Sequence, residues 1–284
     1  MKYLKVMRVK HYLKNLLVFF PIIFSGMFFN YNLLFKSSIG FIAFSLLSSI
    51  IYILNDLKDI EKDRKHPIKK KRPIASGEIS KKEAIILIIV LEILIFIVLF
   101  VTKLLFDVSS IYLLIYFIIN FLYSFGLKNI PILDITILSF GFVLRILYGG
   151  IITSIPISNW LYLTTLSMAF YMALGKRRNE LIRLDDSITR NALKYYTKDF
   201  LEKNMYMFLT LSIVFYSLWA TIGGVNKNTF GISIIMVIII LMKYNMKIES
   251  EGFGDPVDVI FSDKILMGLC IIYACFCFCA LYIM

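Results

Sequence analysis

The sequence predicts an all-α polytopic membrane protein with nine transmembrane helices in a bundle. Its 284 residues are 59% hydrophobic, a higher share than a globular protein surrounded by water needs. The apolar residues gather into runs that approach the roughly 20 residues needed to cross a bilayer as a helix. These nine runs occupy residues 16–35, 38–54, 84–106, 111–127, 132–152, 158–174, 205–225, 229–246 and 264–283.

The basic residues predict how these runs are oriented. With a cytoplasmic N-terminus, 27 of the 31 lysines and arginines fall on the cytoplasmic side, three fall on the other side, and Arg145 lies within a run. Cytoplasmic connections of membrane proteins carry such an excess of positive charge. The sequence therefore predicts a multi-pass protein of the plasma (inner) membrane, with its N-terminus in the cytoplasm.

The order of runs and connections predicts one transmembrane domain over residues 1–284. The first run follows a basic segment, as in a signal peptide, but no small-residue cleavage site follows Phe29, so we expect a retained helix. Long charged loops follow the second and sixth runs, at 55–83 and 175–204, and an acidic loop at 247–263 follows the eighth. The opposite connections are short and nearly uncharged. We therefore expect the chemistry on the cytoplasmic face, in loops 55–83 and 175–204.

Residues 55–78 form the most informative segment, because acids and then bases stand between two apolar runs. The segment contains Asn55, Asp56, Asp59 and Asp63, followed by the basic run Lys69–Arg72. On a helix, positions 55, 59 and 63 share one face, with neighbouring side chains roughly 6 Å apart. Such oxygen ligands suit Mg²⁺, which also takes phosphate oxygens from a substrate. A magnesium–diphosphate site is favoured over a solvated linker whose acids merely offset its bases.

Three ionisable residues lie within apolar runs, where charge is costly. Asp134 and Arg145 are 11 residues apart and face the same way on a helix, while Glu92 lies about two turns into the third run. One interpretation is a structural pair, in which Glu92 or another acid neutralises Arg145. The other is that Arg145 binds the phosphate of a lipid substrate. A transporter or channel with these residues on its permeation path is disfavoured, because almost all charges lie in two loops.

Other residue classes exclude several functions. The net charge of +12 is spread over membrane loops without a recognisable nucleic-acid-binding module, so we expect contact with anionic lipid and no nucleic acid. The four cysteines all lie in the last run, at spacings that form no closed metal site, and are expected to pack as small apolar side chains. His11 and His66 have no partner at ligand spacing, so neither is expected to act as a catalytic base.

The charged segment and several others resemble one known superfamily. N-D-x-x-D-x-x-x-D after the second run looks like the first aspartate motif of the UbiA-type intramembrane prenyltransferases. The continuation to Gly77 is similar to the branch typified by decaprenyl-phosphate phosphoribosyltransferase, although Val9 and Tyr12 depart from that branch's Pro and Trp. The other similar segments are RVKHYLKNLLVFFP, YSFGLKNIPILD, GFVLRILYGG, GKRRNEL and DPVDVIFSD.

The resemblance implies Mg²⁺-dependent transfer of a 5-phosphoribosyl group from phosphoribosyl diphosphate to a polyprenyl phosphate, in cell envelope biosynthesis. The alternative is a UbiA-type transfer of a prenyl group from its diphosphate to an aromatic acceptor, but the second aspartate motif of those enzymes is replaced here by GKRRNE. The metal is expected on Asn55, Asp56, Asp59 and Asp63, of which the three aspartates are also the catalytic residues. The substrate-binding candidates are Lys14, Asn15, Lys69, Arg72, Tyr123, Lys128, Asp134, Arg145, Lys176, Arg177 and Glu180.

Overall fold

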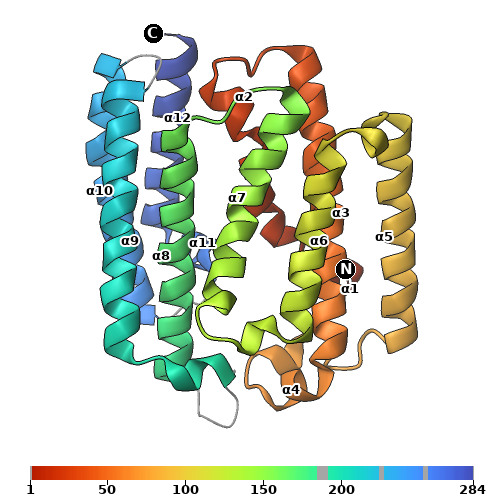
Figure 1. Ribbon diagram of the computed structural model, residues 1–284. Coiled ribbons are helices and arrows are strands. Elements are labelled where there is room, and N and C mark those ends of the chain that lie inside the picture. Colours follow the sequence, from red (N-terminus) through yellow and green to blue (C-terminus); the bar gives the residue numbers. More distant parts are fainter. Residues whose placement is uncertain (1, 184–190, 224–226, 252–254, 284) are drawn as a thin grey trace.

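A computed structural model describes residues 2–183, 191–223, 227–251 and 255–283, and every regular element in these ranges is a helix. Long helices stand side by side and alternate in direction along the chain (Figure 1). They are α3 (Tyr31–Lys58), α5 (Lys81–Val101), α6 (Ser109–Phe125), α7 (Leu133–Thr153), α8 (Asn159–Arg183), α9 (Lys198–Leu218), α10 (Lys227–Glu251) and α12 (Lys264–Tyr282). The predicted all-helical class is confirmed.

Short helices lie before and between the long ones. They are α1 (Lys2–Met7), η1 (Val9–Phe19), α2 (Phe20–Phe24), α4 (Ile60–Lys65), η2 (Lys69–Lys71), η3 (Leu104–Phe106), η4 (Leu127–Asn129), η5 (Asn191–Tyr195), η6 (Trp219–Gly223) and α11 (Pro256–Ser262). Within the described ranges, six helices are long and apolar enough to cross a membrane. The central ones are α3 and α7, since 67% of the apolar stretch of each is buried, against 22% for α5.

The first apolar run, 16–35, is not one helix as the sequence predicts. η1 and α2 end at Phe24, and a turn with Gly26 at φ 75° follows. A new helix, α3, then begins after Asn30, whose side chain accepts hydrogen bonds from the backbone N–H groups of Asn32 and Leu33. An amide side chain at this position satisfies the unpaired donors of the first helical turn. Residues 31–35 therefore belong to α3 and not to the first run.

The N-terminal segment packs between the central helices α3 and α7. η1 packs against α3 and α7, and Figure 1 shows it behind α7. The approach to α7 is close, because a Cβ atom added at Gly149 would lie 2.2 Å from the carbonyl oxygen of Val18. Only glycine leaves room for this contact between backbones. This packing places the side chains of residues 8–15 inside the bundle.

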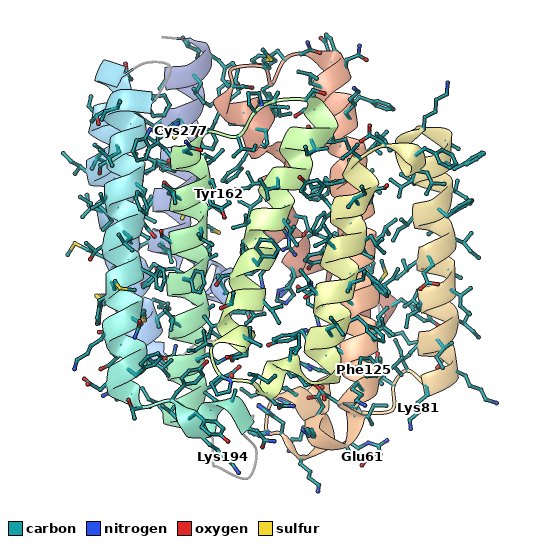
Figure 2. All side chains as sticks on the ribbon, in the orientation of Figure 1. Glu61, Lys81, Phe125, Tyr162, Lys194 and Cys277 are labelled. Atoms are coloured by element: carbon teal, nitrogen blue, oxygen red, sulfur yellow. The ribbon has the colours of Figure 1, made fainter. Side chains whose placement is uncertain are left out.

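Polar elements gather at one end of the bundle. The connections that contain α4, η4 and η5 all lie at the lower end in Figure 1, and Figure 2 shows Glu61, Lys81 and Lys194 there. The loop predicted at 55–83 begins within α3 and includes α4 and η2. The loop predicted at 175–204 begins within α8, and its Asp185 and Asp186 lie outside the described residues.

Candidate functional site

The aspartate motif spans the junction between α3 and α4. Asp59 ends α3 with a backbone at φ −100° and ψ 15°, so positions 55 and 63 lie on two helices rather than on the single helix expected. The backbone N–H of Asp63 still donates to the carbonyl oxygen of Asp59 at 2.8 Å, which keeps the two helices in register. Asp56 and Asp63 are buried, whereas the Asp59 side chain is 22% exposed. The motif therefore presents carboxylates of different accessibility at one end of the bundle.

Each carboxylate of the motif is paired with a cation. Arg72 bridges two of them, since its Nη1 lies 3.0 Å from Asp56 Oδ1 and 2.7 Å from Asp63 Oδ2. Arg8 also pairs with Asp56. The partner of Asp59 is Lys128, whose Nζ lies 2.5 Å from Asp59 Oδ2 and 3.5 Å from Asn55 Oδ1. The structure thus brings Arg72 and Lys128, two predicted substrate-binding residues, onto the aspartate motif.

The donor set of this motif fits a hard cation. Its side chains offer carboxylate and amide oxygens, which Mg²⁺ prefers, and Mg²⁺ commonly takes one or two carboxylates with substrate phosphates and water. Among the residues with described positions, no three His, Cys, Asp or Glu side chains converge as a ready metal site. Because Asp56 and Asp63 both contact Arg72, they lie close enough to share a ligand. The residues therefore suit a metal that arrives with a phosphorylated substrate better than one held by protein alone.

His66 contributes to the local fold. Its Nδ1 accepts hydrogen bonds from the backbone N–H groups of Ile68 and Lys69 at 3.2 and 3.3 Å, which holds η2 in place. Burial, followed by the charge of Lys69, lowers the pKa of its imidazole. A neutral ring with Nδ1 engaged in this way is a structural element of the loop. It places Lys69 beside the motif.

A second cluster of charges is completely buried between α6, α7 and α8. Arg177 Nε lies 2.5 Å from Asp134 Oδ2, and its two terminal nitrogens donate to Glu180 and to the Tyr123 hydroxyl at 2.7 and 3.0 Å. Tyr196, directly after η5, donates to Asp134 at 2.7 Å. Four predicted substrate-binding residues therefore lie in one network. All three guanidinium nitrogens of Arg177 are already engaged by protein.

Arg145 is surrounded by neutral groups. It donates from Nε to Asn15 Oδ1 at 2.7 Å, from Nη1 to the carbonyl oxygen of Gly141, and from Nη2 to the Tyr116 hydroxyl at 2.8 Å. Its guanidinium also lies over three aromatic rings, of which the Tyr116 ring is nearest at 4.9 Å. Glu92, the partner considered from the sequence, lies elsewhere, in a groove between α3, α5 and α6. The expected pair of Glu92 with Arg145 is therefore not formed.

A third cluster joins the N-terminal segment to α11. Lys14 Nζ lies 2.6 Å from Asp255 Oδ2, and His11 Nδ1 lies 3.6 Å from the other oxygen of the same carboxylate. Burial alone raises the pKa of Asp255, but the charges of Lys14 and Lys176 hold it below its usual value. Lys14 and His11 thus approach the two oxygens of one carboxylate from the same segment, η1.

An apolar cavity of about 320 Å³ adjoins this third cluster. Lys14 contributes to one part of its lining, with Pro256 and Val257 of α11. The remaining walls come from η1 and α2, α7, α8, α9, η6 and α12, and include Phe142 and Trp219. The cavity is within the size range of small-molecule sites. It combines a long apolar wall with one cationic group.

Sequence reasoning did not single out Arg8, Asp255 or Tyr196 as site residues. Arg8 appeared only within the basic segment that resembles the superfamily. Asp255 carried one local signal, since an acid followed by proline often begins a helix, and its side chain does accept from the backbone N–H of Val257. No sequence signal distinguished Tyr196 from its neighbours. These residues became visible only through contacts between distant segments.

Fold and site together define a multi-pass helical membrane protein with a charged site at one end of its bundle and an apolar cavity beside it. The chain belongs to the UbiA prenyltransferase family, whose sequence pattern matches residues 18–252. This membership confirms the superfamily expected from the aspartate motif.

Relatives and solved structures agree with this assignment. The chain is 31% identical over 282 residues to decaprenyl-phosphate phosphoribosyltransferase of Mycolicibacterium smegmatis, covering 94% of this chain and 88% of the relative. It is 30% identical to the protein of the same name from Corynebacterium glutamicum, over 99% of this chain and 87% of the relative. A UbiA homolog from Archaeoglobus fulgidus bound to GPP and Mg²⁺ is similar with a TM-score of 0.72 at 20% identity, covering 98% and 97% of the two chains. That last similarity concerns the fold alone.

Proposed function

We propose that this protein transfers a 5-phosphoribosyl group from phosphoribosyl diphosphate to a polyprenyl phosphate and releases diphosphate. The observation that carries the proposal is the makeup of the polar end. It has one carboxylate motif, at residues 55–63, while the end of α8 reads GKRRNE where aromatic prenyltransferases of the family have a second aspartate motif. Cations hold phosphate groups but do not bind Mg²⁺. The relatives named for decaprenyl phosphate support the same reading.

The reaction requires one bond to form and one to break. A phosphate oxygen of the acceptor forms a bond to C1 of the ribosyl group, while the bond from C1 to the diphosphate oxygen breaks and its electron pair leaves with diphosphate. A phosphate monoester has its second pKa near 6, so the acceptor is mostly a dianion at pH 7. No general base is then needed. This suits a protein in which Nδ1 of His66 is bound to backbone N–H groups.

The aspartate motif forms the donor half of the site. Asn55, Asp56, Asp59 and Asp63 would hold Mg²⁺, which neutralises the charge that develops on departing diphosphate. Arg72 and Lys69 bind the diphosphate or the 5-phosphate, with Lys128 beside Asp59 on the opposite side. When the donor arrives, the guanidinium of Arg72 turns from the carboxylates to phosphate oxygens, with which it forms charge-assisted hydrogen bonds.

The polar end of the bundle faces the cytoplasm in this proposal. η1 and α2 together make the first of nine crossings, and the eight long helices make the others. The excess of lysine and arginine at this end supports a cytoplasmic N-terminus in the plasma membrane. Phosphoribosyl diphosphate is water-soluble and highly charged, so it reaches the site only from an aqueous compartment.

A labelled-donor assay tests the proposal. Purified protein in detergent is incubated with Mg²⁺, ribosyl-labelled phosphoribosyl diphosphate and polyprenyl phosphates of several lengths. We expect label in the lipid extract, dependent on polyprenyl phosphate and abolished by EDTA. Failure to label lipid, together with prenylation of an aromatic acid by geranylgeranyl diphosphate, would replace this proposal with the prenyl-transfer alternative.

The prenyl-transfer alternative rests on the apolar cavity. A space of about 320 Å³ beside the site suits the chain of a prenyl diphosphate as well as the first units of a polyprenyl phosphate. The two activities differ in which substrate carries the diphosphate. The assay above separates them, because only one of them moves label from a ribosyl group into lipid.

A further inference from the structure

The cluster formed by His11, Lys14, Asp255 and Lys176 lies apart from the aspartate motif and has the features of a phosphate site. Lys14 is held at 2.6 Å by Asp255, and the charge of Lys176 acts on both Asp255 and His11. His11 Nδ1 is buried without a hydrogen-bond partner among the described atoms. The cluster therefore combines lysine donors with an imidazole nitrogen that protein groups leave unused.

Acids and cations from several helices surround this cluster. Asp255 and, one turn along α11, Asp258 are the acids that act on Lys14 and Lys176 from that helix. Arg145, whose described hydrogen bonds all go to neutral groups, also acts on Lys14. The guanidinium of nearby Arg177 is balanced by Asp134 and Glu180. Glu180 also acts on Lys176, so a phosphate bound here would take the place of Asp255 beside Lys14 rather than neutralise an excess of charge.

The cluster and the adjoining cavity together suit an amphiphilic ligand. Lys14 belongs both to the charged cluster and to the lining of the 320 Å³ cavity, and Pro256 and Val257 follow Asp255 directly into the same lining. Beyond them the cavity walls are mostly apolar, with Phe142 and Trp219 among them. A ligand whose head binds the cluster would therefore place an attached hydrocarbon chain in the cavity.

Tyr52 contacts one residue of the cluster and one partner of the aspartate motif. The His11 ring lies 5.6 Å from the ring of Tyr52, centroid to centroid. The Arg8 guanidinium lies 4.7 Å from the centroid of the same Tyr52 ring, and Arg8 pairs with Asp56 of the motif. A phosphate bound at the cluster would thus lie in the neighbourhood of Tyr52, which also contacts Arg8, the partner of Asp56.

We propose that Lys14 and Lys176 bind the phosphate of the acceptor lipid, that the adjoining cavity holds the isoprene units nearest this phosphate, and that Asp255 is a positioning residue that occupies Lys14 until the phosphate replaces it. This inference rests on the proposed function and deepens it. It assigns the acceptor half to the N-terminal segment, α8 and α11, and leaves Arg177 and Arg145 as groups engaged by protein. The acceptor oxygen then approaches C1 of the ribosyl group from this cluster, and diphosphate leaves towards the aspartate motif.

Tryptophan fluorescence tests acceptor binding without any turnover. The chain has two tryptophans, and Trp219 lines the cavity. The W160F substitution therefore leaves Trp219 as the single tryptophan, in the cavity wall. In detergent, without donor or Mg²⁺, we expect saturable change of Trp219 emission with farnesyl phosphate. Farnesol and inorganic phosphate, each lacking one half of the ligand, should bind at least about tenfold more weakly, as expected for loss of charge-assisted hydrogen bonds or of apolar contact.

Substitutions in the W160F background assign the head-group residues. K14M and K176M should each raise the farnesyl phosphate midpoint by about tenfold or more, the effect of losing a charge-assisted hydrogen bond. K10M is the matched control, because Lys10 is an exposed residue of the same segment, and it should leave the midpoint unchanged. Unaltered binding by both K14M and K176M, or a Trp219 response to phosphoribosyl diphosphate instead of farnesyl phosphate, would overturn the inference.

Failure of this inference can be told from failure of the proposed function. Farnesyl phosphate binding that depends on Lys14 and Lys176, in a protein that moves no ribosyl label into lipid, supports the acceptor site and contradicts the phosphoribosyl donor. Lipid labelling by the wild type, together with unchanged acceptor KM in K14M and K176M, keeps the activity and rejects this location for the acceptor.

Discussion

Two clusters of carboxylates and cations lie near the same end of this bundle, and they differ in their access to solvent. At the aspartate motif, Arg72 is 29% exposed and Asp59 is 22% exposed, and every carboxylate has a cation as its partner. In the network of α6, α7 and α8, Arg177 and Asp134 are both 0% exposed. An open pair can exchange a protein partner for a ligand, whereas a buried pair cannot be separated without leaving a charge unpaired. The comparison indicates a binding role for the first cluster and an architectural role for the second.

The largest expected effect is on the buried cluster. R177M leaves Asp134 and Glu180 without their cation, which should lower the free energy of unfolding by about 3–5 kcal/mol. Thermal unfolding in detergent measures this loss. R178M is the matched control, since Arg178 pairs with Glu202 at a partly exposed position and should lose less. If the R177M protein is stable and fails only to bind acceptor, Arg177 binds the phosphate of the acceptor instead of stabilising the fold.

At the aspartate motif, a substitution should lower turnover without lowering the stability of the fold. D59N should lower turnover by about two to three orders of magnitude, the scale observed when a group that stabilises developing charge is removed, and leave thermal unfolding nearly unchanged. E61Q provides the control, because Glu61 lies only two residues further along, in α4, and its side chain is 77% exposed. EDTA should reduce wild-type turnover to the level of D59N. Turnover that survives both treatments would contradict the magnesium assignment.

The cluster that contains Lys14 and Asp255 is intermediate in exposure between these two. The side chains of Lys14 and Asp255 are 15% and 16% exposed. D255N keeps an oxygen that can cap α11 but removes the charge that competes with phosphate for Lys14. We expect farnesyl phosphate to bind several-fold more tightly, on the scale of one hydrogen bond to a charged group, as measured by Trp219 emission. Weaker binding would mean that Asp255 orients Lys14 and does not compete with the ligand.

The smallest effect is expected at an exposed pair away from both clusters. Lys203 and Asp199 lie 2.7 Å apart on α9, and their side chains are 75% and 73% exposed. Surface pairs of this kind contribute little to stability. K203M should therefore leave turnover and the melting temperature unchanged within error. A clear loss of stability would show that exposure does not separate the clusters as we infer.

The sequence predicted the helical class correctly, because it depends on local patterns, whereas the donor half stays a prediction that rests on local spacing. Apolar runs of spanning length identify helices, and the spacing of Asp56, Asp59 and Asp63 needs only a helical end to bring the carboxylates together. It did not predict the break after Phe24, since the run from 16 to 35 is mostly apolar and the few residues that signal a turn, Gly26 and Asn30 among them, are spread through it.

The remaining site residues depend on contacts between distant segments. Arg177 lies in a run of cations that suggests a phosphate ligand, but its burial against Asp134 and Tyr123 follows from the packing of three helices. The contact between Lys14 and Asp255 joins positions 241 residues apart. No periodicity or spacing within one segment carries that information.

The close contact between Gly149 and the backbone of Val18 has a consequence for how the protein is made. The residues that follow Arg8 are synthesised early, yet the surface that receives them is provided by α7, and the partner of Lys14 is provided by α11. The first segment therefore lacks both partners until α7 and then α11 have been synthesised. Phosphate-binding capacity would arise late in biogenesis, when residue 255 reaches Lys14, and an unfinished chain would enter the bilayer with its acceptor site still unassembled.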